Sequence, residues 1–135
     1  MDTCRLITLP KIFDRRGSLT FVEGGAHVPF AIARAYWIHE VPGGAYRGGH
    51  AYHRLEEVFI ALSGSFDVVL DDGRHRDTVQ LNRSYTGLYI PALVWRSLEN
   101  FSTNAVCLIL ASRRYEPADY LYDRAEFDAA AAGGR

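Results

Sequence analysis

Three side chains near the middle of the chain have the types and spacing of a proton-transfer site. His50 and Tyr52 lie two positions apart, so on an extended strand both point to the same face, and Glu57 follows shortly after. A histidine can accept and release a proton near neutrality because its unperturbed pKa is about 6.5. His50 is therefore the expected proton carrier. Tyr52, with an ordinary pKa of about 10, is expected to donate a hydrogen bond or relay a proton.

The surrounding residues form a known pattern. Residues 49–64, GHAYHRLEEVFIALSG, resemble the first cupin motif, in which a His-x-His pair precedes a glutamate and a closing glycine turn. His50 and Glu57 match, whereas Tyr52 replaces the second histidine. A lone histidine is more often a packed core residue, but this motif favours a functional one. The resemblance implies an all-β cupin, which is a jelly-roll barrel or double-stranded β-helix, here with a C-terminal helix.

The metal site of such a barrel is incomplete. Residues 91–100 resemble the second cupin motif, but Arg96 takes the place of its ligand histidine. A guanidinium stays protonated and has no lone pair for a cation. Only His50 and Glu57 then remain as ligands, and His53 lies off the parity of His50 on an extended strand. We therefore expect no metal and no other cofactor.

The elements that must position these residues are short β-rich runs separated by turns. Turn residues separate the runs at 42–44 (PGG), 63–65 (SGS) and 71–73 (DDG). The pattern predicts a meander of antiparallel strands. The predicted strands cover residues 5–9, 18–22, 30–39, 58–62, 66–70, 78–81, 87–90 and 105–111.

At 135 residues the chain fits one domain with a hydrophobic core. We expect a barrel over residues 1–115, a C-terminal helix over 116–131 and a frayed tail over 132–135. Pro117 suits a first helical position, and good helix formers follow it. The helix is expected to pack outside the barrel or on a partner subunit.

Composition excludes several classes of partner. The formal charge of -1 gives no general attraction to nucleic acid or to anionic membranes. Residues 1–11 lack the apolar stretch of a signal peptide, and no later run approaches the roughly 20 apolar residues of a membrane span. A cytoplasmic location is expected. Cys4 and Cys107 are interpreted as reduced packing residues.

Nearly the whole chain resembles the sugar 3,4-ketoisomerases that act on dTDP-4-keto-6-deoxyglucose, which are relatives of the dTDP-sugar epimerase cupins. This resemblance implies a homodimer and a dTDP-linked keto sugar as substrate. It also implies migration of the ketone from C4 to C3 without a cofactor, in deoxy- or amino-sugar biosynthesis for lipopolysaccharide or other glycans. The matching segments are 14–19 (DRRGSL), 28–30 (VPF), 34–38 (RAYWI), 47–51 (RGGHA), 70–73 (LDDG), 87–89 (GLY), 94–95 (VW), 110–112 (LAS) and 119–120 (DY).

The resemblance also assigns the reacting groups. His50 matches the family histidine thought to move the substrate proton, and Tyr36 matches a tyrosine that points into the barrel. Tyr52 is a departure, because some members carry the pair His-Ala-His, so the second proton carrier is open. The predicted catalytic residues are His50, Tyr52 and Tyr36.

Arginines are expected to hold the substrate, because the planar guanidinium binds phosphate oxygens in pairs. Arg16 and Arg47 fit the diphosphate, and Arg34 is a third candidate. Arg96, like the two tyrosines, is a candidate donor to the oxyanion on O3 or O4. Glu57 either orients His50 or pairs with Arg47, and a purely structural ion pair is an equal alternative. The predicted substrate-binding residues are Arg16, Arg47, Arg96, Arg34 and Glu57.

Two other functions fit the same residues. An epimerase would return the proton to the opposite face of the sugar with the help of a tyrosine, and Tyr52 or Tyr36 keeps that alternative open. A non-catalytic cupin would only bind the sugar. Within the family, Arg16 and Arg96 flank the sugar and vary with the gluco or galacto product, and this chain mixes the two patterns.

Overall fold

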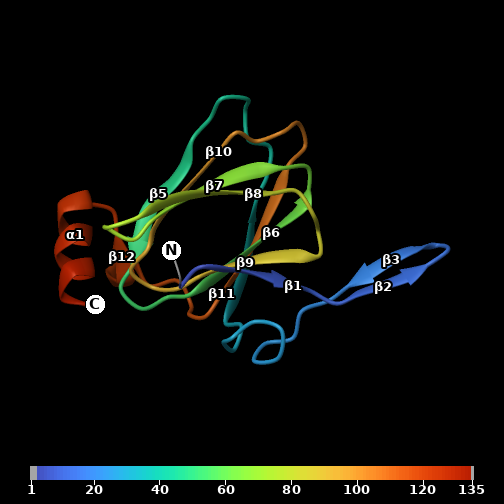
Figure 1. Cartoon of the computed structure of the whole chain (residues 1–135), viewed down its shortest axis with the longest axis horizontal. Coiled ribbons are helices and arrows are strands. Elements are labelled where there is room, and N and C mark those ends of the chain that lie inside the picture. The colour runs from blue at the N-terminus through green and yellow to red at the C-terminus, as the bar shows by residue number, and fades with distance from the viewer. Residues whose placement is uncertain (1–2, 135) are drawn as a thin grey trace.

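The computed structural model describes residues 3–134 as two facing β-sheets with a projecting hairpin and a C-terminal helix (Figure 1). In this part of the chain each sheet has five strands, and the sheets are antiparallel. The first sheet has the order β1 (Arg5–Thr8), β9 (Thr86–Ile90), β6 (Glu57–Ser63), β11 (Val106–Ala111), β4 (Arg34–Ile38). The second has the order β12 (Tyr120–Leu121), β5 (Arg47–Tyr52), β10 (Trp95–Glu99), β7 (Phe66–Asp71), β8 (Arg76–Leu81). The hairpin consists of β2 (Lys11–Asp14) and β3 (Gly17–Thr20).

The core lies between the two sheets. Side chains alternate along a strand, so Phe59 of β6 points inward to meet Phe66 and Leu98, and all three are fully buried. The outer face of β6 is apolar as well, because Val58 and Ile60 pack against residues of the N-terminal segment. The first sheet therefore buries apolar side chains on both faces, which explains why β6 has a nearly continuous apolar sequence.

The predicted all-β pattern is confirmed, but several strands were missed. Strands β2, β10 and β12 lie outside the predicted strand ranges. Strand β5 corresponds to the extended segment that was expected around His50. Strand β5 has the sequence RGGHAY and β10 has WRSLE, so both are poor in β-branched residues. Their glycines and polar side chains are the ones that build the site described below. Because the residues that build the site have low β-propensity, the sequence of these two strands does not indicate a strand.

The C-terminal helix differs from the predicted range of 116–131. The α-helix, α1, spans Arg124–Gly133, because Pro117–Asp119 form a 3₁₀ turn and the chain then pairs with β5 as β12. Asp123 caps α1 by accepting hydrogen bonds from the N–H groups of Ala125 and Glu126. The expected frayed tail is also corrected, since residues 132–133 are helical. Arg135 lies outside the described residues.

Helix α1 packs on the outside of the second sheet, as expected. Phe127 and Ala131 of the helix are buried against Ala51 of β5, Leu121 of β12 and Trp95 of β10. Within residues 3–134 no helix has the length and apolar character that a bilayer span requires. The cytoplasmic location stays a prediction.

The β2–β3 hairpin projects from the rest of the chain as two paired strands (Figure 1). Its apolar side chains are exposed: Phe13 has 79% of its surface accessible, and Ile12 and Leu19 each have 56%. A two-stranded hairpin is marginally stable alone in water. This hairpin therefore exposes apolar side chains on an element that has little stability of its own.

Candidate active site

A cavity of about 370 Å³ opens between the first and second sheets, at β4 and β5. It brings together residues that are far apart in the sequence, from β4, β5, β10 and β12. Five of the predicted site residues line it, namely Tyr36, Arg47, His50, Tyr52 and Arg96. Glu57 lies directly behind them, hydrogen-bonded to Arg96 and the two tyrosines.

Arg96 and Glu57 form a buried ion pair at the base of this cavity. Their side chains are only 2% and 1% exposed. Arg96 donates from Nε to Glu57 Oε1 at 3.0 Å and from Nη2 to Oε2 at 3.2 Å, so the pair is bidentate. Such a pair is stable only when its remaining polar atoms are also satisfied. The sequence left open whether Glu57 orients His50 or pairs with an arginine. The structure shows that it pairs with Arg96 and not with Arg47.

The guanidinium of Arg96 also fixes the backbone and the tyrosines around it. Nη1 donates to the carbonyl of Gly48 at 3.0 Å, and Nη2 lies 3.2 Å from the Tyr36 hydroxyl and 3.4 Å from that of Tyr52. Most of its N–H groups therefore have protein partners. Its predicted role as a donor to the substrate oxyanion stays a prediction, but its positioning role is evident from these contacts.

Gly48 is required by this arrangement for two reasons. Its φ is +76°, in the left-handed region that side chains other than glycine rarely adopt. A Cβ atom at this position would also collide with Nη1 of Arg96. Gly48 therefore makes room for Arg96, which stands at the ligand-histidine position of the cupin motif.

His50 is the half-buried imidazole in the cavity wall. Its Nε2 lies 2.9 Å from the Tyr52 hydroxyl, and its ring contacts those of Tyr120 and Tyr122 at centroid distances of 5.2 and 5.5 Å. Burial, and then the nearby positive charge of Arg96, lower the pKa of His50 from 6.5 to about 3. The imidazole is therefore neutral at physiological pH. It can act as a base.

The two predicted tyrosines are held as hydrogen-bond donors. Tyr36 donates to Glu57 Oε2 at 2.6 Å. Burial, followed by the negative charge of Glu57, raises the pKa of both Tyr36 and Tyr52 far above 10. Neither phenol ionises near neutral pH. They can donate hydrogen bonds, but they cannot serve as phenolate bases.

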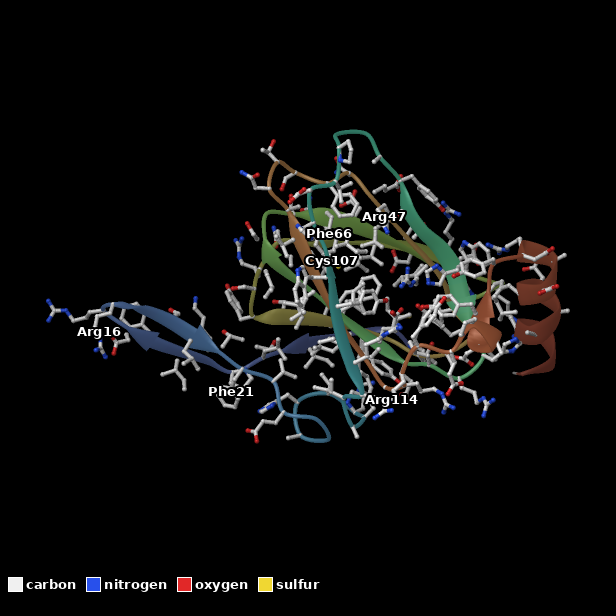
Figure 2. All side chains as sticks on the ribbon, turned by 180° about the vertical axis from the view of Figure 1, so that it is seen from behind. Arg16, Phe21, Arg47, Phe66, Cys107 and Arg114 are labelled. Atoms are coloured by element: carbon white, nitrogen blue, oxygen red, sulfur yellow. The ribbon has the colours of Figure 1, made fainter. Side chains whose placement is uncertain are left out.

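The remaining arginines have different positions. Arg47 lies on the cavity rim. Arg34 stacks over the ring of Tyr36 at 4.7 Å, and its Nε is buried without a hydrogen-bond partner among the described residues. Arg16 does not reach this cavity: it lies at the tip of the β2–β3 hairpin, 91% exposed and paired with Asp14 (Figure 2). Within one chain Arg16 therefore does not flank this cavity, and its expected role at the sugar stays a prediction.

Tyr120 and Tyr122 were missed as site residues. The one sequence feature that indicates Tyr120 is the dipeptide Asp119-Tyr120, which is among the segments that match the family. The Asp119 carboxylate is buried and accepts hydrogen bonds from the N–H groups of Arg54 and Leu55, both at 3.0 Å. This clamp places Tyr120 opposite Tyr52 in the β12–β5 pairing and next to His50.

The histidine, cysteine and carboxylate side chains of residues 3–134 contain no group of three or more that could hold a metal ion. His53 is exposed, and only its backbone N–H contacts Asp119. It lies in a bend after the end of β5 and does not line the cavity. Cys107 is buried in the core, and Cys4 packs against the same core, in agreement with a packing role.

The comparison with known proteins fits this geometry. The family described as "FdtA: WxcM-like, C-terminal" matches residues 2–132. The chain belongs to the FdtA family. A TDP-4-oxo-6-deoxy-alpha-D-glucose-3,4-oxoisomerase from Aneurinibacillus thermoaerophilus is 39% identical over 117 residues, which cover 87% of this chain and 84% of that protein. The family expected from the sequence is therefore confirmed.

Solved structures agree with this assignment to the FdtA family. A histidine-to-asparagine variant of the 3,4-ketoisomerase QdtA from Thermoanaerobacterium thermosaccharolyticum, in complex with TDP-4-keto-6-deoxyglucose, has a TM-score of 0.96 at 34% identity, over 98% of this chain and 96% of that one. The TDP-quinovose 3,4-ketoisomerase WlaRB from Campylobacter jejuni has a TM-score of 0.92 at 41% identity, over 96% and 99%. The 4-keto-6-deoxy sugar epimerase NovW from Streptomyces spheroides has a TM-score of 0.75 at 19% identity, over 88% and 68%, and shares the fold alone. The predicted cupin fold is confirmed.

Breaking the buried ion pair should destabilise the protein strongly. Glu57→Gln keeps the shape of the side chain but leaves the Arg96 cation buried without its counter-charge, so the free energy of unfolding should fall by about 3–5 kcal/mol. Urea denaturation followed by circular dichroism measures this. The control is Glu116→Gln, which removes an exposed pair with Arg113 and should change stability by less than about 1 kcal/mol. Equal effects of the two substitutions would contradict the central role of the pair.

The low pKa of His50 should appear in the pH dependence of stability. The unfolded chain protonates this residue near pH 6.5, whereas the folded chain does so only near pH 3. Protons therefore bind preferentially to the unfolded state between these values, and the stability present above pH 6.5 is lost as the pH falls toward 3. The unfolding free energy of His50→Gln should decline less between pH 7 and pH 5 than that of the unsubstituted protein. His53→Gln, at an exposed position, should follow the unsubstituted protein, and a His50→Gln curve parallel to it would refute the low pKa.

Proposed function

We propose that this chain is an isomerase that moves the ketone of dTDP-4-keto-6-deoxyglucose from C4 to C3. The observation that supports this most directly is a neutral histidine in a cavity whose other polar groups are hydrogen-bond donors held by a buried positive charge. That combination suits removal of a proton from carbon next to a carbonyl. The relatives named above that are more than 30% identical to this chain are 3,4-ketoisomerases.

The proposed reaction begins with His50. Its imidazole takes the proton from C3, and the electron pair of the broken C–H bond forms a C3–C4 double bond while negative charge collects on O4. The proton of the C3 hydroxyl then passes to O4, and His50 returns its own proton to C4. The product carries the ketone at C3 and a hydroxyl at C4. One base on one face suffices, because C3 and C4 are adjacent.

The enediolate needs donors that are already in place. The Tyr36 hydroxyl lines the cavity and stays protonated, and Arg96 adds a fixed positive charge behind it. A preorganised donor in a site of this kind contributes roughly 3 kcal/mol to transition-state stabilisation. We propose that these groups stabilise the charge on O3 or O4, so that no metal or redox cofactor is required. We also propose that Arg47, which lines the cavity, binds the diphosphate. Arg34 stacks on Tyr36 but does not itself line the cavity, so it is the less direct candidate.

The epimerase alternative is less well supported. An epimerase needs a second acid on the opposite face of the ring, and both candidate tyrosines have hydroxyls engaged with Glu57, Arg96 or His50. The epimerases that share the fold are below 20% identity, whereas the ketoisomerases are at 30–41%. The isomerase proposal is therefore preferred.

Conversion of the substrate in heavy water tests the proposal. Chelator-treated protein should convert dTDP-4-keto-6-deoxyglucose in heavy water to the 3-keto isomer, as measured by proton NMR. Deuterium should appear at C4 only to the extent that the proton held by His50 exchanges with heavy water before it is returned. His50→Asn should lower kcat by a factor on the order of 100 to 10,000 while ligand affinity changes little. His53→Gln serves as the control, because His53 is exposed and does not line the cavity. Inversion at a ring carbon with the ketone still at C4 would favour the epimerase, and binding without migration of the ketone would favour a non-catalytic cupin.

We also infer that the protein is a homodimer whose β2–β3 hairpins cover the partner subunit. The hairpin exposes Phe13 and Leu19, and an apolar groove of about 410 Å³ lies at its base, lined by Phe21, Ile60 and Leu108 among others. Among the described strands, β4 pairs only with β11, so one of its edges is open for pairing with another chain. In such a dimer the hairpin tip would carry Arg16 toward β4 and the cavity of the other subunit.

A charge on the hairpin should separate the subunits. Phe13→Asp places a carboxylate in the proposed interface, where burying it without a partner is unfavourable. Size-exclusion chromatography with light scattering should show a dimer for the unsubstituted protein and a monomer for this variant. The control, Gln80→Asp on the exposed face of β8, should remain dimeric. A monomeric unsubstituted protein at micromolar concentration would refute the proposal.

A further inference from the structure

The hydroxyl of Tyr52 lies between the proton carrier and the buried carboxylate. It is 2.9 Å from His50 Nε2 and 3.5 Å from Glu57 Oε2, and the residue is only 4% exposed. His50 and Glu57 themselves have no direct hydrogen bond among those of the described residues. Any influence of the carboxylate on the imidazole through hydrogen bonds therefore passes through this one hydroxyl.

The hydrogen positions around Tyr52 are restricted by its neighbours. The proton of Tyr36 is committed to Glu57 Oε2, at 2.6 Å. Arg96 has only donors, so at 3.4 Å it can give a proton to the Tyr52 oxygen but cannot accept one. The Tyr52 hydroxyl is also hydrogen-bonded to the hydroxyls of Tyr36 and Tyr120. Of the acceptors within its reach, Glu57 Oε2 is the one that carries a negative charge. A neutral imidazole carries one N–H, so the direction of the Tyr52 hydrogen bond sets which ring nitrogen of His50 is bare.

The proposed reaction decides between these two arrangements. A base must present a bare nitrogen to the carbon acid, and Nε2 already faces the Tyr52 hydroxyl. This leaves Nδ1 for the substrate. Nδ1 is bare only when Nε2 carries the proton and donates it to the Tyr52 oxygen. The Tyr52 proton is then free for the charged acceptor, Glu57 Oε2 at 3.5 Å, which gives hydrogen bonds that all run in one direction from imidazole to carboxylate.

We propose that Tyr52 is a positioning residue that connects His50 to Glu57 and holds the imidazole as the Nε2–H tautomer, with Nδ1 as the base. This inference rests on the proposed isomerase function for the role of Nδ1, but the tautomer itself is a property of the resting protein. It makes specific the expectation that Tyr52 donates a hydrogen bond or relays a proton. Tyr52 acts through His50.

The same chain of hydrogen bonds stabilises the charged intermediate. When Nδ1 takes the C3 proton, His50 becomes an imidazolium whose Nε2–H still points at the Tyr52 oxygen, and the Tyr52 dipole points at the Glu57 carboxylate. No proton needs to reach Glu57, because the bidentate contact with Arg96 holds that carboxylate ionised. The proton stays on Nδ1 and returns to C4. A carboxylate that fixes and steadies a histidine in this way is known from the serine protease triad.

Nitrogen NMR of the resting protein tests the tautomer directly. Protein labelled with ¹⁵N-histidine should show His50 with a protonated Nε2 and a bare Nδ1, and the His50→Asn variant assigns the signals. Tyr52→Phe removes the connection, so the two tautomers should mix, and kcat should fall roughly 10- to 100-fold with little change in KM. Tyr52→His should restore the tautomer and much of kcat, because one ring nitrogen can accept from His50 while the other donates to Glu57.

Tyr36→Phe is the matched control. It removes a hydroxyl that is bonded to the same carboxylate and to Arg96 but not to His50, so the His50 tautomer should persist. Its kcat is not the readout, because Tyr36 is itself a proposed donor to the enediolate. A resting protein with the proton on Nδ1, or a Tyr52→Phe protein with an unchanged tautomer, would overturn the inference. The NMR measurement needs no turnover, so it fails or succeeds independently of the isomerase assignment. The spectrum of the unsubstituted protein decides the question even if Tyr52→Phe does not fold.

Discussion

The buried pair of Arg96 and Glu57 is the interaction on which the rest of the site depends. In the second cupin motif, which this chain resembles, position 96 holds a metal-ligand histidine. Here the guanidinium of Arg96 takes that position and brings a fixed positive charge. The carboxylate satisfies the guanidinium and at the same time accepts from Tyr36, so both phenols are oriented by one ion pair. The charge of Arg96 also acts on His50, where together with burial it keeps the imidazole neutral. A polar network of this kind is stable only when nearly every member is satisfied, and here the partners come from four different strands.

The interior of the barrel has an apolar end, which stabilises the fold, and a polar end, which holds the candidate active site. The interior around Phe66 and Cys107 is apolar and fully buried, whereas the interior near β12 holds the charged and hydroxyl groups (Figure 2). The phenylalanine ring of Phe59 lies beneath the Arg96 guanidinium at 5.1 Å and forms the boundary between these regions. The low dielectric of the apolar region strengthens every hydrogen bond in the polar one.

The sequence predicted the parts of this site that depend on residue type and local spacing. His50, Tyr52 and the replacement of a ligand by Arg96 could be read from two short motifs, and the all-β class followed from the turns. It could not predict that Glu57 would choose Arg96 over Arg47, because that choice depends on the register between β10 and its neighbours. Nor could it place Arg16, which matched a family segment but lies on a hairpin that leaves its own barrel. Tyr120 was hidden because a two-residue strand has almost no periodic signal.

Gly48 links two positions that are far apart in the sequence. A Cβ atom at position 48 would collide with the guanidinium of Arg96, so an arginine at position 96 needs a glycine at position 48. A shorter side chain at position 96 would remove this collision, although the positive φ of Gly48 would still favour glycine there. The choice of residue at position 96 therefore constrains the neighbouring strand at a position that has no reacting group of its own.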